Sequence, residues 1–311
     1  MILYKDLRIV FMGTPEFSVA SLEVLVNEGC NIVAVITAPD KPSGRGMQMQ
    51  QSAVKQYALS KHLKILQPEK LKNKDFIDQL KELKADLQIV VAFRMLPEIV
   101  WNMPPLGTIN LHGSLLPQYR GAAPINWAII NGEKQTGVTT FLLQHEIDTG
   151  NILLQEGFAI EETDDAGSIH DKMKKIGAAV LLKTVKAIAS GTLKAKPQLT
   201  DNNRALQHAP KIFTETCLIN FNKPANEVFN LIRGLSPYPA ASTILNNKKL
   251  KIYKAEIIKT HPQIPSGQWQ SDKKNFLYFS CSNGYISVLE LQLEGKKKMK
   301  IDEFLRGYRF E

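Results

Sequence analysis

The chain has 311 residues, 44% of them hydrophobic and 22% charged, which is typical of a folded protein with two domains and excludes an intrinsically disordered chain. No apolar run approaches the ~20 residues that cross a bilayer, and the N-terminus lacks a signal-peptide pattern, so we expect a cytoplasmic protein without a membrane contact. The formal net charge of +9 is compatible with an anionic partner and also with a lysine-rich solubilising surface.

The first two-thirds of the chain alternate strand and helix patterns. Apolar strands separated by helices indicate an α/β fold, a Rossmann-like and mostly parallel sheet covered on both faces. We expect Thr14 to cap the first helix and Gly29 to end it. The predicted strands are 8–12, 30–38, 64–68, 86–93, 107–114, 136–144 and 151–160, and the predicted helices are 16–29, 73–85, 124–132 and 168–190.

The pattern changes after a polar segment, residues 191–210, which we interpret as a linker between a first domain of residues 1–190 and a second domain of residues 211–311. Short strands at close spacing in the second domain indicate a small, OB-like β-barrel. Its predicted strands are 217–221, 241–247, 249–259, 275–282 and 284–293, and its predicted helices are 225–234 and 301–310.

Positive charge is concentrated in this last third. From Leu206 to Glu311, Lys and Arg outnumber Asp and Glu by 16 to 9, whereas the two kinds number 23 and 21 in residues 1–205. A one-sided basic excess is the electrostatic pattern expected for a polyanion partner such as a nucleic acid.

The turn after the first predicted strand does not fit a nucleotide site. A dinucleotide site needs GxGxxG, because three glycines let the backbone approach a pyrophosphate. Here the turn reads GTPEFS, in which Gly13 is the only glycine and Pro15 removes a backbone donor. The chain also lacks the GxxxxGK[ST] pattern of a P-loop. We therefore expect a Rossmann-like sheet that binds no NAD.

Asn110 and His112 lie two residues apart in the strand predicted at 107–114. Strand side chains alternate between faces, so both are expected on one face, near the strand end where open α/β sheets bind ligands. Asp148, two residues before Gly150, lies in a second loop that we expect to return to the same edge.

An amide, an imidazole and a carboxylate suit acyl transfer to an amine. Attack on a formyl carbonyl forms an oxyanion, to which Asn110 can donate an N–H. His112 can accept the proton of the attacking amine. Asp148 can orient the imidazole and help to pass a proton to the leaving nitrogen. The amine attacks directly, so no protein nucleophile is needed.

Other interpretations compete with this one. An isolated Asn-x-His is also compatible with a turn residue and a buried core histidine. A metal site from His112, His145, Glu146 and Asp148 lacks HExxH or HxH spacing, so we expect no metal. The triplet Asp-Thr-Gly at 148–150 occurs in aspartic proteases, which need a second such carboxylate that this chain lacks.

The three cysteines, Cys30, Cys217 and Cys281, are far apart in the sequence, and we expect them to be buried thiols.

Around this cluster the sequence resembles the formyltransferase family that uses 10-formyltetrahydrofolate. The resemblance covers essentially the whole chain, and its most specific stretch is INLHGSLLPQYRGAAPINWAI at 109–129. The other stretches are FMGTPEF at 11–17, DKPSGRG at 40–46, VVAFRMLP at 90–97, TGVTTF at 136–141, IDTGNIL at 147–153 and FNLIRGLSPYPAA at 229–241.

The resemblance implies specific roles. Asn110, His112 and Asp148 would be catalytic, and 10-formyltetrahydrofolate would be the co-substrate. The folate would be bound by two segments, Ser114, Leu115, Leu116 and Pro117 in one and the backbone of Phe93, Arg94, Met95 and Leu96 in the other. The acceptor would be methionyl initiator tRNA, formylated for translation initiation. Its expected contacts are Lys41 and Arg45, in the loop of residues 41–49, and Lys211. We expect a monomer.

The chain departs from the family pattern at two places. Residues 47–50 read MQMQ where some relatives carry lysines, and Asn220-Phe221 stands where relatives often show Asp-Trp. Three alternatives stay open: a formyltransferase for a small amine such as glycinamide ribonucleotide or an amino sugar, a formylfolate hydrolase, and a non-catalytic RNA-binding protein on an enzyme scaffold.

Overall fold

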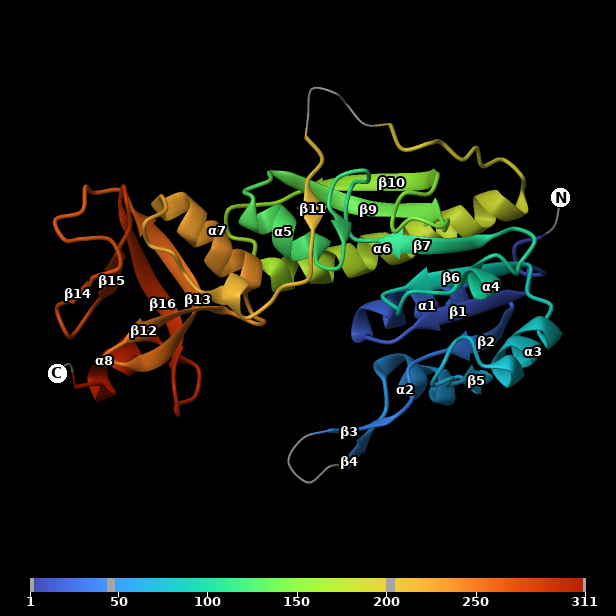
Figure 1. Ribbon diagram of the computed structural model, residues 1–311, viewed down its shortest axis with the longest axis horizontal. Helices are drawn as coiled ribbons and strands as arrows, with labels where there is room; N and C mark the ends of the chain where they lie inside the picture. The colour runs from blue at the N-terminus through green and yellow to red at the C-terminus, as the bar shows by residue number, and fades with distance from the viewer. Residues whose placement is uncertain (1–2, 44–47, 200–204, 310–311) are drawn as a thin grey trace. The chain divides into compact units, whose positions relative to one another are not determined.

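The computed structural model describes residues 3–43, 48–199 and 205–309 (Figure 1). The chain divides into two compact units. The first comprises Met1–Arg120, Gly137–Phe158 and His170–Gln207, and the second comprises Gly121–Thr136, Ala159–Ile169 and His208–Glu311. Within the described ranges, no helix has both the length and the hydropathy needed to cross a bilayer.

The first unit is built around a seven-stranded sheet in the order β10-β9-β7-β6-β1-β2-β5. Five neighbouring strands, from β7 to β5, are parallel, and β9 is antiparallel to β7, so the predicted mostly parallel α/β sheet is confirmed. The strands are β1 (Ile9–Gly13), β2 (Ile32–Ile36), β5 (Ile65–Leu66), β6 (Leu87–Val91), β7 (Thr108–His112), β9 (Gln135–Leu142) and β10 (Ile152–Ala159). The chain order reverses between β1 and β6, the kind of position at which such sheets bind ligands.

The helices of this part of the chain are α1 (Glu16–Asn27), α2 (Ala53–Ser60), α3 (Lys74–Glu82), α4 (Glu98–Trp101) and α6 (Ala166–Ala189). The amphipathic α3 buries Phe76, Ile77 and Leu80 in a core cluster that also contains Val90 of β6. The predicted cap of α1 is wrong by one residue, because Pro15 occupies the N-cap position and makes no side-chain cap bond. Helix α2 was not predicted; its Ser52 cap accepts a hydrogen bond from the Lys55 amide.

The two faces of β7 have different surroundings. On one face, Leu111 packs against α6, where a Cβ added to Gly177 would lie 2.9 Å from Leu111 Cδ2. The neighbouring strand repeats this contact, since Thr140 Oγ1 and Thr184 Oγ1 lie 2.8 Å apart in a hydrogen bond. Side chains alternate along a strand, so Asn110 and His112 project from the opposite face.

The second unit contains an antiparallel sheet in the order β12-β13-β16-β15-β14, with β17 paired to β16. It curls into a half-barrel, which confirms the predicted small barrel-like domain (Figure 1). Buried residues of α7, including Val228 and Ile232, share one core cluster with Leu250 and Ile286 of the sheet. The elements are α5 (Pro124–Ile130), η1 (Glu215–Cys217), α7 (Ala225–Leu235), β12 (Ala241–Leu245), β13 (Lys248–Ile258), β14 (Trp269–Ser271), β15 (Leu277–Ser280), β16 (Tyr285–Leu293), β17 (Met299–Lys300) and α8 (Ile301–Gly307).

The strand predicted at 217–221 is wrong. Its first residue ends the 3-10 turn η1, and only Leu218 makes an isolated bridge, to Ser242. The extended run stops because the Asn220 side chain accepts a hydrogen bond from the Asn222 amide, a local turn that competes with strand pairing. The described residues also form two short strand pairs, β3 (Lys41–Ser43) with β4 (Gln48–Gln50) and β8 (Arg120–Gly121) with β11 (His208–Ala209).

All three cysteines are buried, as predicted. Burial raises the pKa of Cys30 to about 11 and that of Cys281 to about 12, and it also raises the pKa of Cys217. Thiols with such pKa values carry almost no thiolate at neutral pH, so none of the three has the character of a nucleophile.

Candidate active site

His112, the last residue of β7, is buried and held by its ring nitrogens. Nε2 lies 2.9 Å from the carbonyl oxygen of Tyr119, and Nδ1 lies 3.8 Å from Oδ2 of Asp148. A carbonyl oxygen can only accept, so Nε2 carries the hydrogen of this bond. In the neutral imidazole, Nδ1 is then the basic nitrogen. Phe141 meets the ring edge-on, with centroids 6.5 Å apart.

Asp148 reaches His112 by a loop that turns back along the sheet. Leu142, the last residue of β9, pairs with Ile109 near the start of β7, whereas His112 pairs with Thr139. The loop therefore has to return about 10 Å, three residues at strand spacing, to bring its carboxylate to the imidazole. The Leu142 amide donates to the Asn151 carbonyl at 3.0 Å and closes this loop.

Both residues that flank the imidazole adopt left-handed backbone conformations. The φ angle is 61° at Tyr119 and 55° at Asp148. Aspartate tolerates this region, but for a bulky residue such as tyrosine it is unusual and costs about 1–3 kcal/mol. Strain of this kind persists only where surrounding contacts impose it, and it concentrates at functional sites.

Asn110 lies on the same strand face as His112, as predicted. It pairs with Val90 of β6 and Phe141 of β9 and is partly exposed. Among the residues that the structure describes, none forms a hydrogen bond with its carboxamide. The N–H groups of Asn110 can therefore donate to a ligand without breaking an internal bond.

Side chains of β9 and β10 hold the loop that follows His112. Thr139 Oγ1 donates to the Ser114 carbonyl at 2.7 Å and accepts from the Leu116 amide at 3.2 Å. Gln155 Nε2 donates to the Leu116 carbonyl at 2.8 Å. The side chains of Ser114 and Leu116 are buried, whereas Leu115 and Pro117 are partly exposed. This stretch therefore presents a shaped backbone and two partly exposed side chains.

The segment after β6 also presents its backbone. The Arg94 guanidinium donates to the carbonyl oxygens of Glu69, at 2.7 Å, and Pro68, and burial lowers the pKa of Arg94. These bonds hold the segment against the loop at 68–69. Leu96 is buried in the core beside Val90, while Met95 is 78% exposed.

An ion pair anchors the β3–β4 hairpin. Asp40 accepts hydrogen bonds from Lys55 Nζ at 2.6 Å and from Gln67 Nε2 at 2.9 Å. Both bonds lower the pKa of the Asp40 carboxyl, and the bond from Lys55 has the larger effect. The carboxyl is therefore charged at neutral pH. Lys41, the first residue of the hairpin, is exposed, and Arg45 lies outside the described residues.

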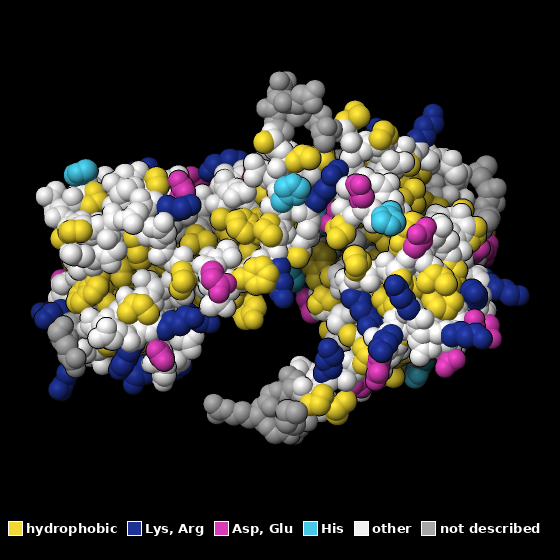
Figure 2. All heavy atoms as spheres, viewed as in Figure 1, with side chains coloured by type: hydrophobic (Ala, Val, Ile, Leu, Met, Phe, Trp, Pro, Cys, Tyr) yellow, Lys and Arg dark blue, Asp and Glu magenta, His cyan; other side chains and the backbone are white. Residues whose placement is uncertain are grey.

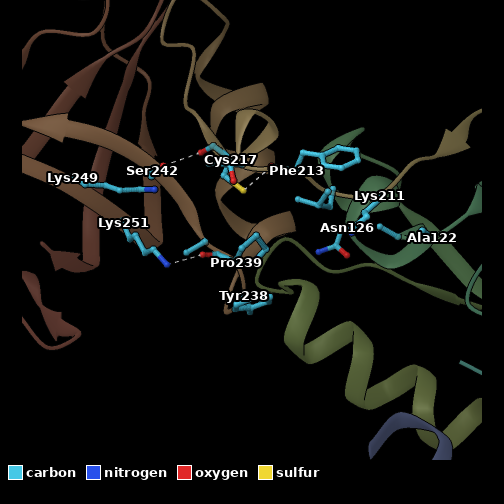
Figure 3. Close-up of a pocket in the computed structure, with 14 residues that line it drawn as sticks. Ala122, Asn126, Lys211, Phe213, Cys217, Tyr238, Pro239, Ser242, Lys249 and Lys251 are labelled. Carbon is cyan, nitrogen blue, oxygen red and sulfur yellow. Dashed lines mark hydrogen bonds between the residues drawn. The ribbon is translucent and has the colours of Figure 1, made fainter. Parts of the chain in front are cut away.

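A cavity of about 440 Å³ lies within the second unit (Figure 3). Three lysines line it, Lys211, Lys249 and Lys251, together with the exposed aromatic rings of Phe213 and Tyr238. Lys211 Nζ lies 5.7 Å from the centroid of the Phe213 ring, and Lys251 Nζ donates to the Pro239 carbonyl at 3.2 Å. Figure 2 shows further Lys and Arg side chains along the lower edge of this unit. The described residues contain no group of three or more side chains suited to holding a metal ion.

Comparison with known proteins adds the family. A family model described as formyl transferase matches residues 7–185, and one described as formyl transferase, C-terminal domain, matches residues 211–309. The chain belongs to the formyl transferase family.

Relatives of this formyl transferase match over nearly their whole length. The methionyl-tRNA formyltransferase of Bacteroides fragilis is 55% identical over 311 residues, which cover 98% of this chain and 96% of the relative. That of Flavobacterium johnsoniae is 49% identical over 310 residues, which cover 98% of both chains.

Solved structures share the fold at lower identity. An N-formyltransferase from Helicobacter canadensis, in complex with folinic acid and dTDP-3-aminofucose, matches with a TM-score of 0.67 at 23% identity over 91% of this chain and 98% of that one. HypX from Aquifex aeolicus, in complex with tetrahydrofolic acid, matches with a TM-score of 0.64 at 19% identity over 98% of this chain and 48% of that one.

Sequence reasoning missed the carbonyl of Tyr119, which orients His112. Tyr119 lies inside the stretch that carries the family resemblance, but its contribution is a backbone atom. No residue-type pattern identifies a backbone acceptor. The only indication is the length of the loop between the two residues, which has to place this carbonyl beside the imidazole.

Gly150 is a sensitive position in the loop of Asp148. A Cβ at this residue would lie 1.7 Å from the Leu142 carbonyl oxygen, so the loop has to move to accept any side chain. We expect Gly150→Ala to lower Tm by at least about 3 °C, because overpacking costs roughly 1–3 kcal/mol. Thermal unfolding by calorimetry measures this. Gly307→Ala is the control, since nothing lies within 4 Å of a Cβ there. Equal Tm values for Gly150→Ala and the wild type would contradict the prediction.

Proposed function

We propose that the chain transfers the formyl group of 10-formyltetrahydrofolate to the α-amino group of methionyl initiator tRNA, for translation initiation in the cytoplasm. The observation that carries this is end-to-end similarity, at about half of all positions, to enzymes named methionyl-tRNA formyltransferase. The structural similarity to sugar N-formyltransferases is far weaker in sequence and supports the fold alone.

Three side chains carry the chemistry in this proposal. The methionyl amine attacks the formyl carbon, and the carbonyl oxygen becomes an oxyanion that accepts an N–H from Asn110. His112 accepts the amine proton at Nδ1, because Nε2 already donates to the Tyr119 carbonyl. Asp148, 3.8 Å from Nδ1, stabilises the imidazolium and helps to return the proton to the leaving nitrogen of the folate.

The folate occupies the side of the sheet that carries Asn110 and His112. Two segments flank that position, the loop of Ser114, Leu115, Leu116 and Pro117 and the backbone of Phe93, Arg94, Met95 and Leu96. Their hydrogen-bonded supports make them rigid, which suits the recognition of a flat, polar ring by backbone groups. The Arg94 side chain serves this role indirectly, by holding its segment in place.

The tRNA is held by two groups of basic residues. Residues 1–190 perform the transfer, and the linker at 191–210 joins them to the second domain. This second domain, residues 211–311, binds tRNA phosphates through Lys211 and its neighbours around the cavity. Lys41, at the start of the hairpin anchored by Asp40, and Arg45, which lies between β3 and β4 in the sequence, contact the acceptor end. Lysines beside exposed aromatic rings suit a nucleic acid, which offers both phosphates and bases that stack. The protein acts as a monomer.

An acceptor panel tests the proposal. With 10-formyltetrahydrofolate as donor, we expect formylation of charged initiator tRNA and little formylation of charged elongator tRNA. Glycinamide ribonucleotide and a dTDP-amino sugar test the small-amine alternative, and release of formate without acceptor tests the hydrolase. Transfer to a small amine alone, or formate release alone, would overturn the proposed acceptor. The absence of any turnover would favour a non-catalytic RNA-binding protein.

Neutralising the cavity lysines is expected to weaken tRNA binding. We expect Lys211→Met with Lys249→Met to raise KM for tRNA at least about tenfold, with little change in kcat or in KM for folate. Each lost phosphate contact lowers the slope of log KM against log salt concentration by about 1, so the slope should fall by about 2. Steady-state kinetics between 50 and 200 mM salt would measure both quantities.

The control removes the same charge from the first unit. Lys70→Met with Lys72→Met changes two exposed lysines of the loop before α3 and should leave KM for tRNA and its salt slope nearly unchanged. Equal losses in the two double variants would mean that the effect comes from total charge and not from the cavity.

A further inference from the structure

Gln198 joins the two segments that flank His112. Its Nε2 donates to the carbonyl oxygens of Asp148, at 2.9 Å, and Gly150, at 2.8 Å. Its Oε1 accepts from Arg120 twice, from Nη2 at 2.6 Å and from Nε at 3.1 Å. One carboxamide therefore uses both of its N–H groups on the loop of Asp148 and its oxygen on the residue that follows Tyr119.

These two segments determine the surroundings of the imidazole. Tyr119 supplies the carbonyl that holds Nε2, and Asp148 supplies the carboxylate that faces Nδ1. Both residues have left-handed φ angles, which a free loop would relax. The bond to the carbonyl of Asp148 acts on the peptide that follows this left-handed residue. The bonds from the Arg120 guanidinium connect the side chain of the residue after Tyr119 to the same carboxamide.

The backbone near Gln198 is paired with the sheet. Two residues earlier, Lys196 forms an antiparallel bridge with Ile152 of β10, in which each backbone amide donates to the other's carbonyl, at 2.7 and 2.8 Å. The Gln198 side chain is half-buried, so its hydrogen bonds are partly shielded from water. It connects the polar segment after α6 to a site made by β7 and the β9–β10 loop.

We propose that Gln198 is a positioning residue, which sets the separation between Nδ1 of His112 and the carboxylate of Asp148. Glutamine suits this position because it donates twice and accepts in the same plane. Glutamate keeps the oxygen for Arg120 but replaces the donors with an acceptor that repels two carbonyl oxygens. The proposal rests on the proposed function, since it assigns Gln198 a part in formyl transfer.

Three variants separate positioning from folding. Methionine has a length similar to that of glutamine but cannot form these hydrogen bonds. We expect Gln198→Met to lower kcat about 10- to 100-fold, because misplacement of a catalytic group by ~1 Å can cost about 100-fold in rate. The KM values for tRNA and folate should stay within about threefold of the wild type. Gln198→Glu should lose a similar factor although it keeps the partner of Arg120. Leu199→Ala is the control, an 80% exposed neighbour in the same segment, and it should retain the wild-type kcat.

A double-mutant cycle decides whether Gln198 acts through Asp148. In an Asp148→Asn background, Gln198→Met should lower kcat by less than about threefold, because residues that act as a unit are non-additive. An equal loss in both backgrounds, or a wild-type kcat for Gln198→Glu, would overturn the proposal. Circular dichroism spectra and Tm values of all variants show whether the fold is kept. If the wild type itself fails to formylate initiator tRNA, it is the proposed function that fails.

Discussion

Replacing His112 by alanine is expected to lower kcat for formyl transfer about 100- to 10,000-fold, the range that a positioned general base contributes. The imidazole is buried, its Nε2 is fixed by the Tyr119 carbonyl, and its Nδ1 is the basic nitrogen nearest to the Asp148 carboxylate. Without it, the attacking amine has no base at this position. Single-turnover formylation of methionyl initiator tRNA measures the rate directly.

His145→Ala is the matched control for this prediction. His145 lies exposed in the same β9–β10 loop as Asp148, and it should keep the wild-type kcat. Folate binding, followed by fluorescence or calorimetry, should be nearly unchanged in both variants, because the proposed folate contacts lie in other segments. A kcat for His112→Ala within tenfold of the wild type would remove the histidine from the reaction.

Replacing Asn110 by alanine is expected to lower kcat about 100- to 1,000-fold, the usual loss when one donor to an oxyanion is removed. Its carboxamide forms no hydrogen bond with other described residues, so its N–H groups are ready to bind a developing negative charge. The effect belongs to the transition state, so kcat should fall while KM for folate stays within about threefold. Asn110→Asp, which replaces the donor with a negative charge, should be at least as slow.

Asn102→Ala provides the comparison for Asn110. Asn102 is an exposed asparagine at the end of α4, and its replacement should change kcat by less than a factor of about two. If Asn110→Ala raises KM for folate in proportion to any loss in kcat/KM, the amide contributes to binding and not to stabilisation of the transition state.

The sheet could be predicted from the sequence because its signals are local. The runs at 8–12 and 86–93 are apolar apart from Arg8, Asp86 and Gln88, and they correspond to the buried strands β1 and β6. Alternation along β7 predicted that Asn110 and His112 lie on one face. The strand predicted at 217–221 failed because Asn220 forms a turn with its own neighbours, a competition that hydrophobicity does not report.

The partners of His112 could be predicted only in part. Residue types pointed to Asp148, but its approach depends on a loop that begins beside Ile109 and runs back along β7. The roles of the Tyr119 carbonyl and the Gln198 carboxamide are not indicated by residue type, because one contributes a backbone atom and the other contacts segments far away in sequence. Local patterns thus predicted that His112 and Asp148 lie close together, and they missed the groups that hold these two residues in place.

The left-handed residues beside His112 have a consequence for the energetics of a catalytic cycle. Holding Tyr119 in this conformation costs about 1–3 kcal/mol, and the fold meets that cost before any substrate arrives. The imidazole is therefore preorganised, and the binding energy of folate and tRNA is not consumed in aligning it. Some thermal stability is given up permanently in return for a small reorganisation energy at each turnover.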